Sequence, residues 1–233
     1  MTFLLNVFAQ EKNIEQLKQK IKETPYVIEG EVLNVEIYAG DKEGVPIDLS
    51  KDNVEFDNSG LGYYKLSDGS NAIVYNKATV QVCKIYKGNK IQQGIIEIIT
   101  KRKYMAANYN PEGGGFSNKE GLFFNEAVTE ANDEITIYPS QIGLNVFFFL
   151  KDFSSKENTP FNNTYTMTNI YGSISIFSKE KGSVGYYEDA YAGGFNQLFK
   201  TKDELNKFLN RFPSLNINAP NYCNPTPEKK NVG

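Results

Sequence analysis

The alternation of apolar and polar residues is clearest between residues 73 and 100. Apolar residues alternate with polar ones at Ala78, Val80 and Val82. A period of two residues is typical of a strand whose two faces differ. Residues 95–100 form a short β-branched run, which also favours a strand. Gly88, between the two runs, can take the positive φ of a turn. The stretch therefore predicts two strands joined by a turn, and it carries no chemistry of its own.

Two further segments predict strands near the start and the middle of the chain. Residues 26–38 form the first strong strand, and Gly30 within it predicts a bulge or a sharp bend. The apolar runs 122–124 and 146–150 are too short for helices. They predict strands that are buried on both faces.

The last strands are predicted to form a hairpin. Residues 171–178 alternate cleanly between apolar and polar positions. Residues 184–187 are predicted to pair with them across the turn at Lys181 and Gly182.

Two polar stretches separate the strands. Residues 39–71 are rich in Gly, Asp, Asn and Ser and predict a long hairpin or excursion. Their acids lack the spacing of a calcium loop, so calcium binding is the less favoured alternative. Residues 104–117 predict a loop, because Gly113–Gly115 has neither the glycine frame nor the following helix of a phosphate-binding turn.

A helix is predicted at each end of this β region. The first spans residues 13–23, has one apolar stripe and is stopped by Pro25. The second spans residues 201–211 and begins with the capping box formed by Thr201 and Glu204. Its buried stripe is predicted to contain Leu205, Phe208, Leu209 and Phe212.

The ends of the chain differ from the middle. Residues 1–10 hold a short apolar run followed by Ala-Gln, which predicts a signal-peptide remnant without its basic first part. The alternative is an apolar N-terminal strand. Residues 213–233 hold four prolines and predict a tail or linker leading to a further domain. A single β-rich domain is therefore expected over residues 11–212, and no run is long enough to span a bilayer.

Composition removes several kinds of chemistry. The chain has no His among its 233 residues. This excludes imidazole as a general base, as a metal ligand and as a member of a catalytic triad within the chain. The formal net charge of −3 gives no attraction to nucleic acid. The one dense basic run, residues 101–103, fits the solvated end of a strand. No cofactor is predicted.

The two cysteines leave two alternatives open. Cys83 and Cys223 cannot form a structural zinc site by themselves. In an oxidising compartment they would pair, tying the tail to the central strand, and in the cytosol they would stay reduced. Export favours the disulfide, with two unpaired thiols as the alternative.

One cluster of aromatic and acidic residues is a candidate ligand site. It consists of Tyr186, Tyr187, Glu188, Asp189 and Tyr191. Tyrosine rings can stack on a sugar ring while carboxylates accept hydrogen bonds from its hydroxyls. A glycosidase would need two carboxylates at a set separation, which the sequence does not reveal. Core tyrosines in a strand-to-helix connection are the alternative interpretation.

The order of motifs resembles known β modules. YVIEGEVLNVE is followed by VQVCKIYKG, IIEIIT and KEGLFFNEAV. This order is similar to an N-terminal module of proteins exported by the bacterial type IX sorting system. It is also similar to netrin-like domains, which include the tissue inhibitors of metalloproteinases. The resemblance covers residues 26–128 and implies an OB-type β-barrel. The inhibitors' N-terminal Cys and dense disulfides are missing here, so no functional residue is carried over.

The predicted fold is therefore α+β and mainly β: an OB-like barrel or a strongly bent antiparallel sheet with an N-terminal and a C-terminal helix. The predicted function is that of a non-catalytic binding or accessory module of an exported or cell-surface bacterial protein, with a protein or glycan partner. The alternatives are a netrin-like inhibitor of extracellular proteases and a carboxylate-based glycoside hydrolase. The scattered acids and the absence of a nucleophile motif favour the first.

Overall fold

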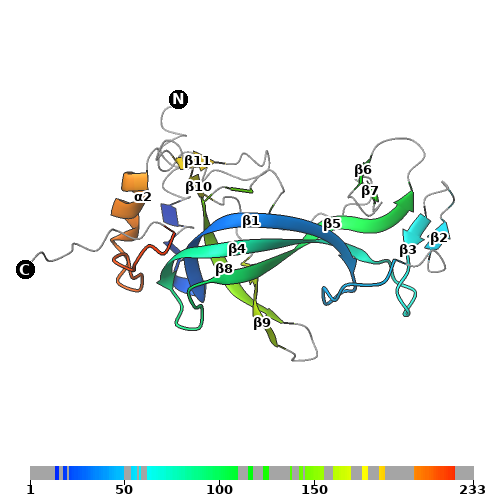
Figure 1. Cartoon of the computed structure of the whole chain (residues 1–233), viewed down its shortest axis with the longest axis horizontal. Helices are drawn as coiled ribbons and strands as arrows, with labels where there is room; N and C mark the ends of the chain where they lie inside the picture. The colour runs from blue at the N-terminus through cyan, green and yellow to red at the C-terminus, as the bar shows by residue number, and fades with distance from the viewer. Residues whose placement is uncertain are drawn as a thin grey trace, which may run out of the picture.

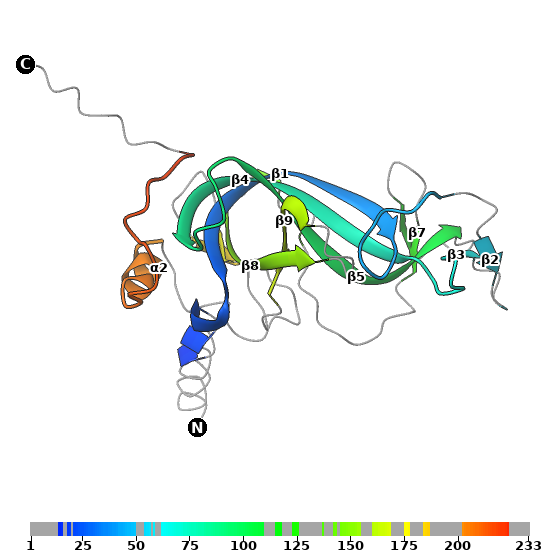
Figure 2. The ribbon, with the colours of Figure 1, turned by 90° about the horizontal axis from the view of Figure 1, so that it is seen from below.

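The computed structural model shows a long, bent β-sheet with a helix at one end (Figures 1 and 2). It describes residues 14–15, 18–19, 21–49, 54–56, 58, 62–109, 115–117, 123–125, 137, 142–143, 145–154, 160–168, 175–177, 184–186 and 202–223. The elements are β1 (Tyr26–Gly40), β2 (Val54–Phe56), β3 (Gly62–Tyr64), β4 (Ile73–Lys87), β5 (Ile95–Tyr109), β6 (Gly115–Ser117), β7 (Phe123–Asn125), β8 (Asn145–Ser154), β9 (Pro160–Met167), β10 (Ser175–Phe177), β11 (Val184–Tyr186) and α2 (Lys202–Leu209). Ahead of β1, residues 14–15, 18–19 and 21–23 are helical. The described chain is thus mainly β, as predicted.

Five strands pair in a circuit that returns to its start. β1 pairs with both β4 and β8, and β4 pairs with β5. β9 lies antiparallel to β8 and parallel to β5, so it joins the two ends of this row. We call these five strands the ring. The sheet is therefore bent and mixed. The predicted alternative of a strongly bent antiparallel sheet is correct for the bend and wrong only where β9, which was not predicted, lies parallel to β5.

The bend of β1 has a local cause. The β1–β4 ladder shifts its register between Glu29 and Gly30 and again between Val32 and Asn34. A Cβ at Gly30 would lie 2.5 Å from Cγ1 of Val80 and 3.0 Å from the backbone oxygen of Gln81. Only glycine allows the two strands to approach this closely. The predicted irregularity at Gly30 is confirmed.

The predicted pair of strands between residues 73 and 100 is present and longer than expected. β4 and β5 are antiparallel, with Gln81 opposite Ile95, and Gly88 has a φ of 109°. β5 continues to Tyr109 because its last residues pair with β3 and β7. The prediction of a loop over residues 104–117 is therefore wrong where β5 and β6 lie. Partner strands impose extended structure on a segment that has no alternation of its own.

Strand β9 was not predicted. Its sequence, PFNNTYTM, begins with proline and holds two adjacent asparagines, and Asn163 has a positive φ of 60°. Such residues are depleted in strands, so neighbouring strands rather than propensity place this segment in the sheet. Without β9, the sequence could not show how β5 and β8 are joined.

Apolar side chains gather in three clusters. The ring core lies between the strands of the ring and contains Tyr26, Ile28, Val32, Ala78, Val80, Val82, Ile91, Ile96, Ile98, Ile137, Val146, Phe148, Leu150 and Tyr165. The helix-side core contains Ile21, Val27, Tyr86, Phe147, Phe149, Phe208, Leu209 and Leu215. The arm core is smaller and contains Ala39, Tyr64, Ala72 and Val74.

Strand β8 explains how two cores fit on one sheet. Val146, Phe148 and Leu150 belong to the ring core, whereas Phe147 and Phe149 belong to the helix-side core. All five are buried, as predicted for an apolar run without alternation. Each such side chain contributes about 1.5–3 kcal/mol relative to its exposed state.

The excursion between β1 and β4 forms the opposite end of the molecule. β2 and β3 lie within residues 39–71, and β3 pairs with the far end of β5. In Figure 1, β2, β3, β6 and β7 gather at the end opposite α2. We call the described residues between 33 and 77 the arm; they include the second half of β1, β2, β3 and the first part of β4. Among the described residues, no helix has the length and apolar composition to cross a membrane.

Candidate functional site

The predicted aromatic and acidic cluster falls at the limit of the described chain. Tyr186 is the last residue of β11, and its backbone lies opposite Ser175 of β10. Tyr187, Glu188, Asp189 and Tyr191 lie outside the described residues. The hairpin of β10 and β11 is present, and the ligand site beside it stays a prediction.

A polar surface that was not predicted lies on the outer side of β1, β4 and β5. In the ladder, Glu36 of β1 lies opposite Lys77 of β4, and Thr79 lies opposite Glu97 of β5. Alternate residues of a strand share one face, so the side chains of these positions project on the same side of the sheet. The residues between them, Val35, Ala78 and Ile98, belong to the ring core or pack against it. We call the surface of Glu36, Lys77, Thr79, Ile95 and Glu97 the outer face.

One lysine bridges the three strands of this face. Nζ of Lys77 lies 3.0 Å from Oε2 of Glu36 and 3.6 Å from Oε1 of Glu97. The hydrogen bond to Glu36 raises the pKa of Lys77, and the charges of Glu97 and Glu36 add to this against the opposing effect of burial. The two carboxylate side chains remain 55% and 44% exposed. The strip is therefore both ordered and accessible.

The outer face changes character along the strands. Ile95 lies opposite Gln81 at one end and is 55% exposed, which is unusual for a large apolar side chain. At the other end, Tyr38 and Tyr75 stack with ring centroids 5.4 Å apart. Tyr75 of this pair is only 3% exposed and Tyr38 is partly exposed, so the accessible part of the outer face consists of the charged middle and the apolar end at Ile95.

The stacked tyrosines also hold a loop. The hydroxyl of Tyr38 donates to the backbone oxygen of Gly44, and that of Tyr75 donates to the backbone oxygen of Asp41. Oδ1 of Asp41 accepts the backbone N–H groups of Glu43 and Val45. Burial, followed by the charges of Glu97 and Asp41, raises the pKa of Tyr38. The 41–45 loop is thus fixed beside the outer face.

A buried polar pair lies between the ring and α2. The hydroxyl of Tyr86 donates to Oε2 of Glu29 over 3.0 Å, and both residues are only 2% exposed. Burial and the neighbouring carboxylate raise the pKa of Tyr86. Nζ of Lys84 lies 4.9 Å from the centre of the Tyr86 ring. The pair orders the interior and is too enclosed to receive a ligand.

A second tyrosine–carboxylate pair lies on the other side of β8. The hydroxyl of Tyr26 contacts both carboxylate oxygens of Asp152, at 2.9 and 3.2 Å. Burial, and then the hydrogen bond to Asp152, raises the pKa of Tyr26 to about 12. The Tyr26 ring meets Tyr165 of β9 edge to face, so this pair ties β1 to β8 and β9.

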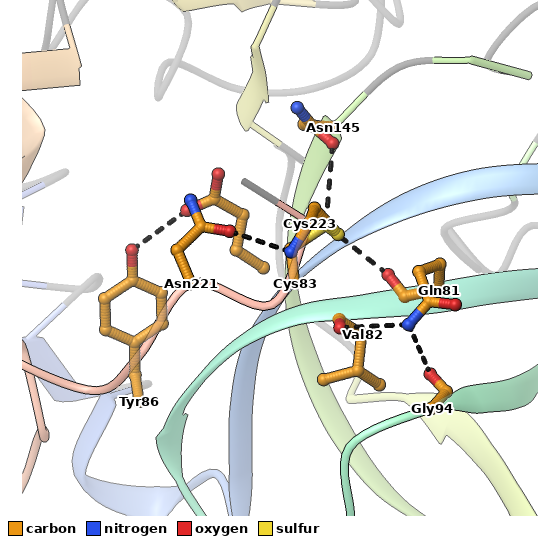
Figure 3. The surroundings of a disulfide bond; sticks show 9 residues. Gln81, Val82, Cys83, Tyr86, Gly94, Asn145, Asn221 and Cys223 are labelled. Atoms are coloured by element: carbon orange, nitrogen blue, oxygen red, sulfur yellow. Dashed lines mark hydrogen bonds between the residues drawn. A yellow bond between two sulfur atoms is a disulfide. The ribbon is translucent and has the colours of Figure 1, made fainter. Parts of the chain in front are cut away.

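Cys83 and Cys223 form a disulfide, with Cα atoms 4.8 Å apart (Figure 3). This is the disulfide that the sequence predicts for an exported chain. The backbone N–H of Tyr222 donates to the oxygen of Cys83, and that of Asn216 donates to the oxygen of Tyr86. Residues 213–223, which the sequence placed in the proline-rich tail, therefore run along the end of β4.

The outer face could be recognised only after the strands were aligned. Alternation places Glu36 and Tyr38 on one face of β1, and Tyr75, Lys77 and Thr79 on one face of β4. The register that sets Glu36 against Lys77 depends on the bulges in β1, which the sequence does not number. Within the described part of the chain, no group of three or more His, Cys, Asp or Glu side chains could hold a metal ion.

Comparisons with protein-family models, curated proteins and solved structures gave no match to this chain.

Proposed function

We propose that this chain is a non-catalytic binding or accessory module of an exported protein, and that it contacts its partner through the outer face. One observation carries the proposal: β1, β4 and β5 bury one side in the ring core and leave Glu36, Glu97 and Ile95 of the other side accessible, although Tyr75 and Ile99 of that side are buried. Glu36, Lys77 and Glu97 bridge these strands, and Ile95 is exposed beside them. Side chains on a rigid sheet lose little entropy on binding, which makes such a face suited to recognition.

The same proposal includes an OB-like barrel as the scaffold. Its support is the order of pairing around the ring, β1–β4–β5–β9–β8–β1, with β5 and β9 parallel. Barrels of this type bind ligands on the outer face of their second and third strands. Those strands correspond here to β4 and β5. The pairing is testable by NMR: cross-strand NOEs between residues 97–98 and 164–165 should follow the parallel pattern.

Export is supported by the disulfide between Cys83 and Cys223. Such bonds form and persist in oxidising compartments and are rare in the cytosol. The test is to quench thiol exchange directly in the native cells and then to label the protein with a maleimide. An exported chain should label only after reduction, and labelling of both thiols without reductant would contradict export.

The binding test uses two matched variants. The face variant is E36Q/K77M/E97Q, and the control is E55Q/K65M, which removes the Lys65–Glu55 ion pair of the arm. Both are screened with the native chain against a glycan array and a panel of secreted proteins that includes proteases. We expect saturable binding that is at least about tenfold weaker for the face variant only.

Two results would overturn this function. Binding that is equal for the native chain and the face variant would remove the outer face from the proposal. Turnover of a glycoside or peptide by the purified chain, lost in E188A or D189A, would establish a carboxylate hydrolase instead.

A further inference from the structure

The segment after α2 is attached to the sheet in two different ways. Leu215 is buried with Phe208 and Leu209 in the helix-side core. The backbone N–H of Asn216 donates to the oxygen of Tyr86, and Nζ of Lys84 donates to the oxygen of Ile217. This first part is anchored by apolar packing as well as by hydrogen bonds.

The second part, residues 218–223, lies beyond that core. Its attachments to β4 include the hydrogen bond from Tyr222 N–H to the oxygen of Cys83, at 2.7 Å, and the disulfide. The β4–β5 ladder has already ended, with Gln81 opposite Ile95. We call residues 218–223 the strap, because they cover the part of β4 that β5 does not reach.

We propose that the strap is a redox-controlled cover. Reduction of the Cys83–Cys223 bond by a dithiol would release residues 218–223 from β4, while α2, Leu215 and the ring stay in place. The release would free the backbone oxygen of Cys83 at an edge of the sheet. Unpaired edge groups of this kind accept an added strand.

The chemistry of opening follows from the unequal exposure of the two cysteines. Cys83 is 1% exposed, whereas Cys223 is partly exposed, so the attacking thiolate reaches the sulfur of Cys223. The S–S bond breaks, the sulfur of Cys83 leaves and takes up a proton, and a mixed disulfide forms on Cys223. The second thiol of the reductant then displaces Cys223, which is protonated in turn. Two electrons and two protons reach the protein, and the reductant becomes a disulfide.

The surroundings of Cys83 suit the reduced form. Its Sγ lies 3.6 Å from the backbone oxygen of Gln81 and 3.8 Å from Oδ1 of Asn145 (Figure 3). A disulfide sulfur has no proton to donate to either oxygen. A buried thiol could donate to one of them, so reduction leaves no unsatisfied group at this position.

The test is residue-resolved hydrogen exchange of the full chain, oxidised and after treatment with dithiothreitol. We expect the Tyr222 amide to exchange at least about tenfold faster after reduction. The amides of Asn216, Val82 and Gly143 donate to Tyr86, Gly94 and Val32. They should keep these hydrogen bonds after reduction, so their NMR chemical shifts should stay unchanged even though loss of the cross-link lowers the global stability. The C223S variant should show the reduced pattern without reductant and should not respond to it.

Each of the other outcomes would contradict the proposal that reduction releases the strap. An unchanged Tyr222 amide would mean that non-covalent contacts hold residues 218–223. Changed chemical shifts at Val82 and Gly143 as well would mean that the disulfide is needed for the native structure of the whole domain. Restored protection of Tyr222 after reoxidation with glutathione disulfide is required, and failure of the protection to return would also contradict the proposal.

Discussion

Strands β1 and β4 each run through two regions that are built differently. In the ring, residues 26–30 of β1 are all buried, because the ring core lies on one side and the helix-side core on the other. In the arm, residues 33–38 of the same strand are exposed or partly exposed. The strands are continuous, so the difference comes from the elements that cover them. A strand can therefore be buried along one half and be exposed or partly exposed along the other.

The two regions are also held together by different interactions. The ring end has a disulfide that joins residues 140 positions apart and two apolar cores. The arm has a small core of Ala39, Tyr64, Ala72 and Val74, and an exposed ion pair of 3.0 Å between Lys42 and Asp68. Hydrogen bonds from Ser70 and then from Lys42 lower the pKa of Asp68. We expect the arm to open locally before the ring does.

The largest effect should come from removing the covalent bond of the ring end. The C83A/C223A variant should lose about 4–5 kcal/mol of unfolding free energy, because the long loop that the disulfide closes restricts the unfolded chain. Denaturant titration of the oxidised protein and the variant measures this loss. A loss of unfolding free energy below about 1 kcal/mol would mean that the disulfide does not make the ring end more stable than the arm.

Two valines of β4 provide a matched comparison of the cores. Val80 lies in the ring core and Val74 in the arm core, and both are fully buried. V80A should cost about 2–3 kcal/mol and V74A about 1 kcal/mol, because the smaller cluster can collapse around a cavity more completely. Both values come from denaturation midpoints at an unchanged m-value. Equal costs would show that the arm is packed as rigidly as the ring.

Much of the sheet could be predicted from the sequence because burial leaves a pattern. The alternation around Val80 and the apolar run of β8 were sufficient for strands. The extension of β5 to Tyr109 and the whole of β9 were missed because their neighbours, not their side chains, make them strands. Local sequence does not record a pairing that is decided elsewhere in the chain.

The candidate site was harder to predict for a related reason. Glu36, Lys77 and Glu97 are ordinary surface residues until the register of three strands brings them together. The aromatic cluster that begins at the end of β11 could be recognised in the sequence because its members lie within six residues of one another. Sites assembled across strands have no such signal, and the bulge that skips Leu33 changes which residues meet.

Two tyrosine hydroxyls, that of the buried Tyr86 and that of the partly buried Tyr38, extend the comparison to polar contacts. Tyr86 in the ring end donates to the carboxylate of Glu29, and Tyr38 in the arm donates to the backbone oxygen of Gly44. Y86F should cost about 1–2 kcal/mol and Y38F about 0.5–1 kcal/mol, because hydrogen bonds to charged acceptors are the stronger ones.

The pH dependence of stability tests the hydrogen bonds of the same two tyrosines, Tyr86 and Tyr38. The folded pKa of each is raised, so the unfolded state loses its proton first, near pH 10, and stability falls as the pH rises through the folded pKa. Each Phe variant should therefore lose less stability than the native chain between pH 9 and about pH 11. A native chain whose stability is constant across this window would contradict both assignments.

The smallest effect on stability is expected at the lysine that bridges the outer face. K77M removes the ion pairs with Glu36 and Glu97, which are largely accessible to solvent, so the cost should stay below about 1 kcal/mol and shrink in high salt. The folded pKa of Lys77 is raised, so its contribution is present below about pH 10.4 and is lost as the pH rises through the folded value. Denaturation in 0.05 and 1 M salt should thus show a difference in unfolding free energy between the native chain and K77M only in low salt. A cost that persists in high salt would mean that Lys77 supports the sheet through packing of its stem, and the outer face would then be part of the scaffold rather than a surface available to a partner.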